Sequence, residues 1–86
     1  MPAVARLNDL IYNEKLGNIP LVEGSSSVFA NGKPVGRIGD RDSTSTDYIS
    51  NGSSSVFVNG KSVGRVGDHT ASGGYILTGS PNVFIG

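Results

Sequence analysis

The sequence predicts a small all-β domain, a cone of three β-hairpin units with pseudo-threefold symmetry, adjacent termini and little or no helix. Three observations lead to this prediction. A 17-residue motif (24–40) recurs along the chain, Asn-Gly dipeptides lie between strand-like runs, and no segment has an apolar stripe at helical spacing. Among the 86 residues, 13 are glycine, which suits a single small domain with many tight turns.

The repeat predicts a ring of three units that closes on itself. Residues 24–40 read GSSSVFANGKPVGRIGD and residues 52–68 read GSSSVFVNGKSVGRVGD. A third copy starts as GSPNVFIG in 79–86 and is completed, without a gap, by MPAVARLND in 1–9. Since residues 79–86 need residues 1–9 to complete this copy, we expect one domain over 1–86. The chain termini then lie inside the third unit of the ring. The alternative is an open tandem array whose third copy is degenerate.

Each unit is predicted to be a hairpin around a two-residue turn. Asn31-Gly32 and Asn59-Gly60 favour type I′ turns, which need positive φ at both central residues. Such a turn places Phe29 opposite Pro34 and fixes the register. In the third unit the turn position falls on the two chain ends.

Alternation along these strands predicts which side chains share a face. We expect the phenylalanine face to point inward, with small residues at positions 5, 36 and 64 leaving room for the rings. The predicted shared core around the threefold axis consists of Phe29, Phe57, Phe84, Leu7, Ile38 and Val66. Among the linkers that join the units (10–23, 41–51 and 69–78), residues 10–18 are expected to hold one short helical turn.

Composition excludes several classes of function. Seven Lys and Arg balance seven Asp and Glu, which argues against nucleic acid as a partner. No cysteine is present, so disulfides and thiolate metal sites are excluded. No stretch approaches the roughly 18 apolar residues of a membrane span, so no stable membrane insertion is expected. The start of the chain lacks a signal peptide, which predicts synthesis in the cytoplasm without one.

The units resemble PAAR-repeat proteins, a family named for a Pro-Ala-Ala-Arg tetrad. The tetrad positions read Pro-Val-Gly-Arg in 34–37, Ser-Val-Gly-Arg in 62–65 and Ala-Val-Ala-Arg in 3–6. The flanking Val-Phe-x-Asn-Gly-Lys and the Gly-Asp after the Arg also fit the family in 24–40 and 52–68. The resemblance implies a cone that caps a trimeric β-helical spike, the puncturing tip of type VI secretion systems and contractile phage tails.

This resemblance predicts that the protein is a non-enzymatic structural tip that caps and sharpens a membrane-puncturing spike. We expect one copy per spike trimer, separate cargo effectors, and a location at a virion tail tip or a secretion-apparatus tip. The Gly-Ser-Ser-Ser runs lack the Walker pattern and a recurring base, which argues against an enzyme. The alternative function is a small threefold carbohydrate-binding module, which would need an aromatic residue at the same position of each linker. Tyr48 and Tyr75 occupy such a position, but the remaining linker, 10–23, has Pro20 there.

Two kinds of site residue follow from the repeat and the resemblance. Family cones often bind one zinc or iron ion near the point through His and Cys. Here His69 is the single candidate ligand of these types. Because a zinc site requires about four ligands, this count argues against a bound ion. A weak site of His69 with carboxylates stays open. Arginines recur at one position of each unit and are candidates for docking to the spike: Arg6, Arg37 and Arg65.

Overall fold

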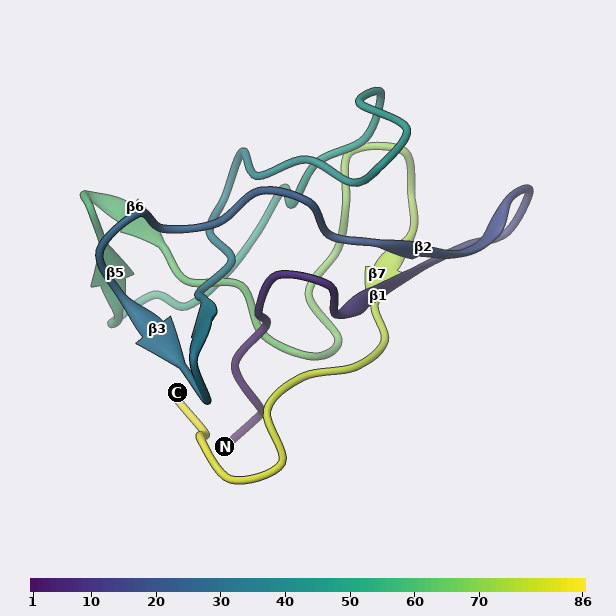
Figure 1. The fold of residues 1–86 in the computed structure, drawn as a ribbon. Coiled ribbons are helices and arrows are strands. Elements are labelled where there is room, and N and C mark those ends of the chain that lie inside the picture. Colours follow the sequence, from purple (N-terminus) through teal and green to yellow (C-terminus); the bar gives the residue numbers. More distant parts are fainter.

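The computed structural model describes residues 1–86 and contains seven short strands and no helix, which confirms the all-β prediction. Strand β1 (Leu10–Asn13) lies between β2 (Gly17–Pro20) and β7 (Tyr75–Ile76) in a three-stranded sheet. Two separate hairpins pair β3 (Phe29–Ala30) with β4 (Lys33–Pro34) and β5 (Phe57–Val58) with β6 (Lys61–Ser62) (Figure 1). None of its elements is a helix suited to crossing a membrane.

The predicted turns and register of the two hairpins are confirmed. Asn31 and Gly32 have φ angles of 56° and 76°, and Asn59 and Gly60 repeat this conformation at 55° and 77°. Positive φ at both central residues costs little for Asn-Gly and matches the twist of the flanking strands. In the first hairpin Phe29 pairs with Pro34, as the two-residue turn requires.

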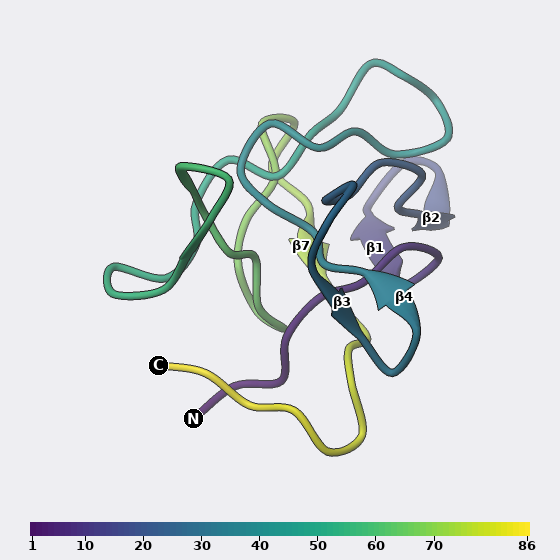
Figure 2. The same cartoon turned by 60° about the vertical axis from the view of Figure 1, so that its left-hand side comes forward.

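The two ends of the chain pair with each other as the missing hairpin. Ala3 forms an antiparallel bridge with Phe84, which matches the pairing of Phe29 with Pro34 in the intact hairpin. The amide of Ile85 donates to the carbonyl of Pro2 at 3.0 Å. Both views show the N- and C-termini side by side (Figures 1 and 2). The prediction of adjacent termini is therefore confirmed.

A closed cycle of backbone hydrogen bonds joins the three units at the centre. The amide of Gly36 donates to the carbonyl of Ala5, Ala5 donates to Gly64, and Gly64 donates back to Gly36, each at 2.9 Å. Three isolated bridges around this cycle repeat the same connection from unit to unit: Val4 with Arg65, Arg6 with Val35, and Arg37 with Val63. These contacts support a threefold arrangement, while the rotational symmetry itself stays a prediction.

Two apolar clusters lie on opposite faces of this central layer, because neighbouring residues of an extended chain point to opposite sides. The first contains Ala5, Ile11, Leu21, Ile49 and Ile76, with Ile38 and Val66 packed against it. The second contains Val4, Ala30, Val35 and Val63, with Val56, Val58 and Ile85 packed against it. The single core predicted from the sequence is thus divided in two.

The predicted phenylalanine core is wrong. Phe29, Phe57 and Phe84 are 54%, 57% and 49% exposed, and Leu7 is half-buried outside both clusters. The strands alternate as expected, but the aliphatic face of each hairpin points inward. Only Ile38 and Val66 of the predicted set pack against a buried cluster.

The space left by the small residues is filled by aliphatic side chains of the linkers. A Cβ on Gly36 would lie 2.7 Å from Leu21 Cδ2, and one on Gly64 would lie 3.1 Å from Ile49 Cδ1. Leu21, Ile49 and Ile76 are each at most 1% exposed and occupy the same position ahead of their units. They take the place that the sequence interpretation assigned to the rings.

The short helical turn expected within 10–18 is also wrong, because this segment forms the β1–β2 hairpin. Ile11 is 1% exposed and pairs with Ile19 on one side and Ile76 on the other. Asn13 Oδ1 accepts hydrogen bonds from the amides of Lys15 and Leu16, which closes the turn. The pairing of β1 with β2 and with β7 therefore makes this segment a strand.

Candidate docking surface

The hairpins surround an open apolar hollow of about 150 Å³. Ten residues line it, and all are hydrophobic. Nine of them form three sets with one member from each unit: Val4, Val35 and Val63; Val28, Val56 and Val83; Ala30, Val58 and Ile85. Phe29 completes the lining. The hollow therefore offers a similar apolar side chain from each of the three units.

Large apolar side chains extend this surface onto its outer flank. The three phenylalanines occupy equivalent strand positions and are each about half exposed, and Val28 and Val83 are 40% and 37% exposed. We call the hollow together with these residues the hairpin face. Large exposed apolar side chains next to an apolar hollow mark an interaction site more often than single exposed residues do.

A polar margin accompanies the hairpin face. Lys33 pairs with Ala30 and Lys61 pairs with Val58 next to the two intact turns, and both lysines are exposed. An apolar centre with charged residues at its margin is the usual anatomy of a protein–protein interface.

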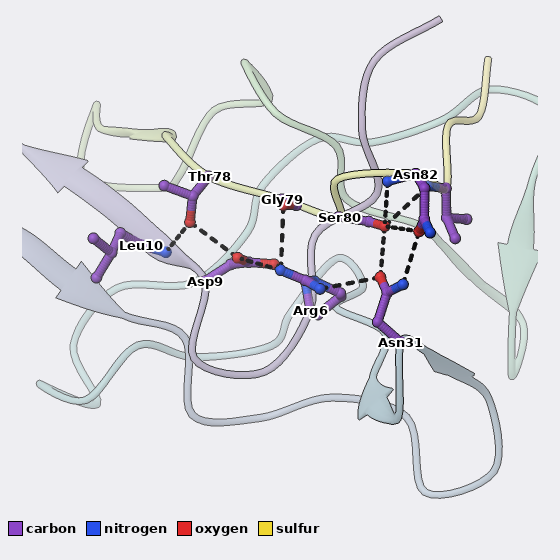
Figure 3. A network of polar contacts seen from close by, with 9 residues as sticks. Arg6, Asp9, Leu10, Asn31, Thr78, Gly79, Ser80 and Asn82 are labelled. Atoms are coloured by element: carbon purple, nitrogen blue, oxygen red, sulfur yellow. Dashed lines mark hydrogen bonds and ion pairs between the residues drawn. The ribbon is translucent and has the colours of Figure 1, made fainter.

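Arg6, one of the three docking candidates, is buried in a seam between units (Figure 3). Its Nε donates to Asp9 Oδ2 at 2.9 Å, its Nη1 to Asn31 Oδ1 at 3.0 Å and its Nη2 to the carbonyl of Gly79 at 3.2 Å. Asp9 also accepts a hydrogen bond from the hydroxyl of Thr78 at 2.9 Å. The guanidinium thus ties together three segments of the chain.

Arg37 repeats this seam, whereas Arg65 makes only part of it. Arg37 pairs with Asp40 and donates to Asn59 Oδ1 at 3.1 Å and to the carbonyl of Gly24 at 3.2 Å. The side-chain hydrogen bonds of Arg65 all go to Asp68. In all three arginines the hydrogen bond that the guanidinium donates to its partner aspartate raises the pKa of the arginine, against the opposing effect of burial. Docking by these arginines stays a prediction, and the contacts of Arg6 and Arg37 with other segments indicate a seam role for these two.

The unequal contacts predict unequal costs of removing two arginines. Arg6→Ala loses hydrogen bonds to Asn31 and Gly79 as well as the ion pair, whereas Arg65→Ala loses the ion pair alone. We expect Arg6→Ala to lower the free energy of unfolding by about 1–2 kcal/mol more than Arg65→Ala does. Urea unfolding of the two variants measures this difference. Equal losses would contradict the seam role of Arg6.

His69, the candidate metal ligand, is exposed and lies outside any group of metal-binding side chains. Its backbone amide donates to Asn51 Oδ1, and its carbonyl accepts from the amide and hydroxyl of Ser50. No group of three or more His, Cys, Asp or Glu side chains that could hold an ion occurs in the chain. The donor set therefore does not fit the zinc or iron ion implied by the resemblance.

Comparison with protein families matches the PAAR motif over residues 22–78, well over half of the chain. The chain belongs to the PAAR-motif family. The PAAR family is a structural spike-tip family of contractile injection systems. None of the curated proteins compared with the chain matches it significantly.

Sequence reasoning missed the hairpin face although its signal is present in the repeat. Each PAAR unit carries an aliphatic residue on both sides of its phenylalanine, such as Val28 and Ala30 around Phe29. Alternation indicates that these two share a face, but it does not say which face is inside. The prediction therefore divided the strand positions correctly between the two faces of each hairpin, but it placed the wrong face inside.

Proposed function

We propose that this PAAR protein caps a trimeric β-helical spike through the hairpin face, with one chain bound per trimer. The observation that carries the proposal is the lining of the hollow, where nine apolar side chains form three sets of one residue per unit. A surface that presents similar side chains from three units suits a partner made of three identical chains. Each unit then makes nearly the same contact with one subunit of the spike.

Burial of the hairpin face supplies the driving force for docking. Transfer of apolar surface from water contributes roughly 25 cal/mol per Å² before the costs of association. The face contains several large side chains that are 37–57% exposed in the free chain, including Phe57 and Val83. Docking also stabilises a small domain, because a partner that binds only the folded state shifts folding by mass action.

In this proposal the opposite end of the domain is the leading point. In the view of Figure 1 the linkers extend toward the side of the molecule opposite the β3–β4 and β5–β6 hairpins. The role is mechanical, since a narrow capped point concentrates the force of contraction on a small area of the target envelope.

Co-elution with a spike fragment tests the proposal. The chain is mixed with the trimeric β-helical end of a spike encoded in the same genome and run on a size-exclusion column. We expect a complex with the unchanged chain, and loss of the complex with Val28→Glu, which places a charge on the hairpin face. Leu16→Glu is the matched control, because Leu16 is 60% exposed at the end of the β1–β2 hairpin. Sugar binding on a glycan array without spike binding would favour the carbohydrate-binding alternative.

A further inference from the structure

One chain of polar contacts joins all three linkers of the domain. Asn13 belongs to the first linker, Asp47 to the second and Ser72 to the third. The hydroxyl of Ser72 donates to Asp47 Oδ2 at 2.7 Å, and its amide donates to Asp47 Oδ1 at 2.9 Å. Asn13 Nδ2 donates to the same hydroxyl at 3.2 Å. Ser72 is therefore the meeting point of the three segments.

Asp47 is the charged centre of this junction. It is 3% exposed, and Oδ1 also accepts the amide of Tyr48 at 3.0 Å. Burial raises the pKa of Asp47, but the hydroxyls of Ser72 and Thr70 and the amides of Ser72 and Tyr48 lower it by more. The net pKa lies below the ordinary value, so the carboxylate is held in its charged form. Hydrogen bonds to a charged acceptor are the stronger class.

We propose that the junction of Asp47, Ser72 and Asn13 closes the pointed end of this chain in place of a metal ion. A metal ion can cross-link the linkers only where their side chains supply about four ligands. Here the linkers offer no group of three His, Cys, Asp or Glu side chains, and the oxygens of Asp47 already accept hydrogen bonds. The same cross-link is made by neutral donors around one carboxylate.

Backbone contacts around the junction strengthen the same connection. The amide of Ala71 donates to the carbonyl of Tyr48 at 3.0 Å, and the amide of Asp42 donates to the carbonyl of Asp47 at 3.1 Å. The first contact joins the third linker to the second, and the second contact closes the second linker on itself beside the carboxylate. Loss of the junction is expected to loosen this end of the domain first.

Thermal unfolding of Ser72→Ala tests the proposal. This substitution removes the donor to Asp47 Oδ2 and the acceptor for Asn13 while keeping the backbone amide. We expect the loss of these two side-chain hydrogen bonds to lower its Tm by about 4–8 °C, a shift that is readily measured in a domain of this size. Ser54→Ala is the control, because Ser54 is exposed and its side chain makes no hydrogen bond, and its Tm should stay unchanged.

Two further measurements separate the junction from a metal site and from a general loss of stability. Chelator added to the unchanged chain should leave its Tm unaltered, and elemental analysis should find no stoichiometric zinc or iron. In Asp47→Asn the amide of Ser72 should exchange with solvent faster than in the unchanged chain. A stoichiometric metal whose removal lowers Tm would overturn the proposal. A Tm for Ser72→Ala equal to that of Ser54→Ala would overturn it as well. None of these readouts depends on spike binding, so they stand apart from the proposed function.

Discussion

Replacing any one of the three phenylalanines of the hairpin face with Ala is expected to weaken binding to the spike by a similar factor. Phe29, Phe57 and Phe84 occupy equivalent positions and are 54%, 57% and 49% exposed in the free chain. Aromatic anchors that become buried in an interface typically contribute about 2 kcal/mol or more, which is roughly a 30-fold change in Kd. Because these rings are not part of the buried clusters, the fold should survive each change.

Calorimetric titration of each variant into the spike fragment, at one salt concentration, measures the three factors. Leu16→Ala is the control, since Leu16 lies on the β1–β2 hairpin and not on the hairpin face. If a single phenylalanine carried the whole effect and the other two were neutral, three equivalent contacts would be ruled out.

Ile49→Ala is expected to cause the largest loss of stability. Ile49 is fully buried in the first apolar cluster and fills the space above Gly36 and Gly64. Truncation leaves a cavity between all three units, and such substitutions of buried Ile or Leu cost about 2–5 kcal/mol. The backbone hydrogen bonds of Ile49 with Gly39 and Asp40 remain, so the change isolates the side chain.

Urea unfolding of Ile49→Ala against Val22→Ala provides the matched comparison. Val22 is 44% exposed on the first linker, so its truncation should cost well under 1 kcal/mol. A loss for Ile49→Ala as small as that for Val22→Ala would mean that the linker residues do not form a shared core.

The parts of the fold that the sequence predicted are those fixed by local chemistry or by the repeat. Asn31-Gly32 determines its turn and register, since few other dipeptides adopt positive φ twice. The register of the third copy predicted that Phe84 would meet the start of the chain, and it pairs with Ala3. Neither prediction requires knowledge of how the hairpins pack against each other.

The predictions that were wrong concern which side chains are buried, which depends on how the hairpins pack against the linkers. Period-two alternation shows that Phe29 and Val28 point to different faces, but the interior was assigned to the larger side chain. In the structure Gly36 faces Leu21, and the aliphatic residues of the hairpins enclose the hollow. The recurrence of Leu21, Ile49 and Ile76 ahead of each unit was visible in the sequence and was the better indicator of the core.

The junction of Asp47, Ser72 and Asn13 had no signal in the sequence. Asp47 and Ser72 are 25 residues apart and belong to linkers whose polar residues do not recur in register. Their contact depends on where the ring brings the linkers. A side-chain contact of this kind follows from the fold and not from a local pattern.

The mass of the complex between this chain and a spike trimer, measured by light scattering, tests the central claim most directly. One chain that presents three similar units to three identical subunits should add a single chain mass, 8.9 kDa, to each trimer. An added mass of three chains per trimer would show that each subunit binds its own copy, and it would contradict the account.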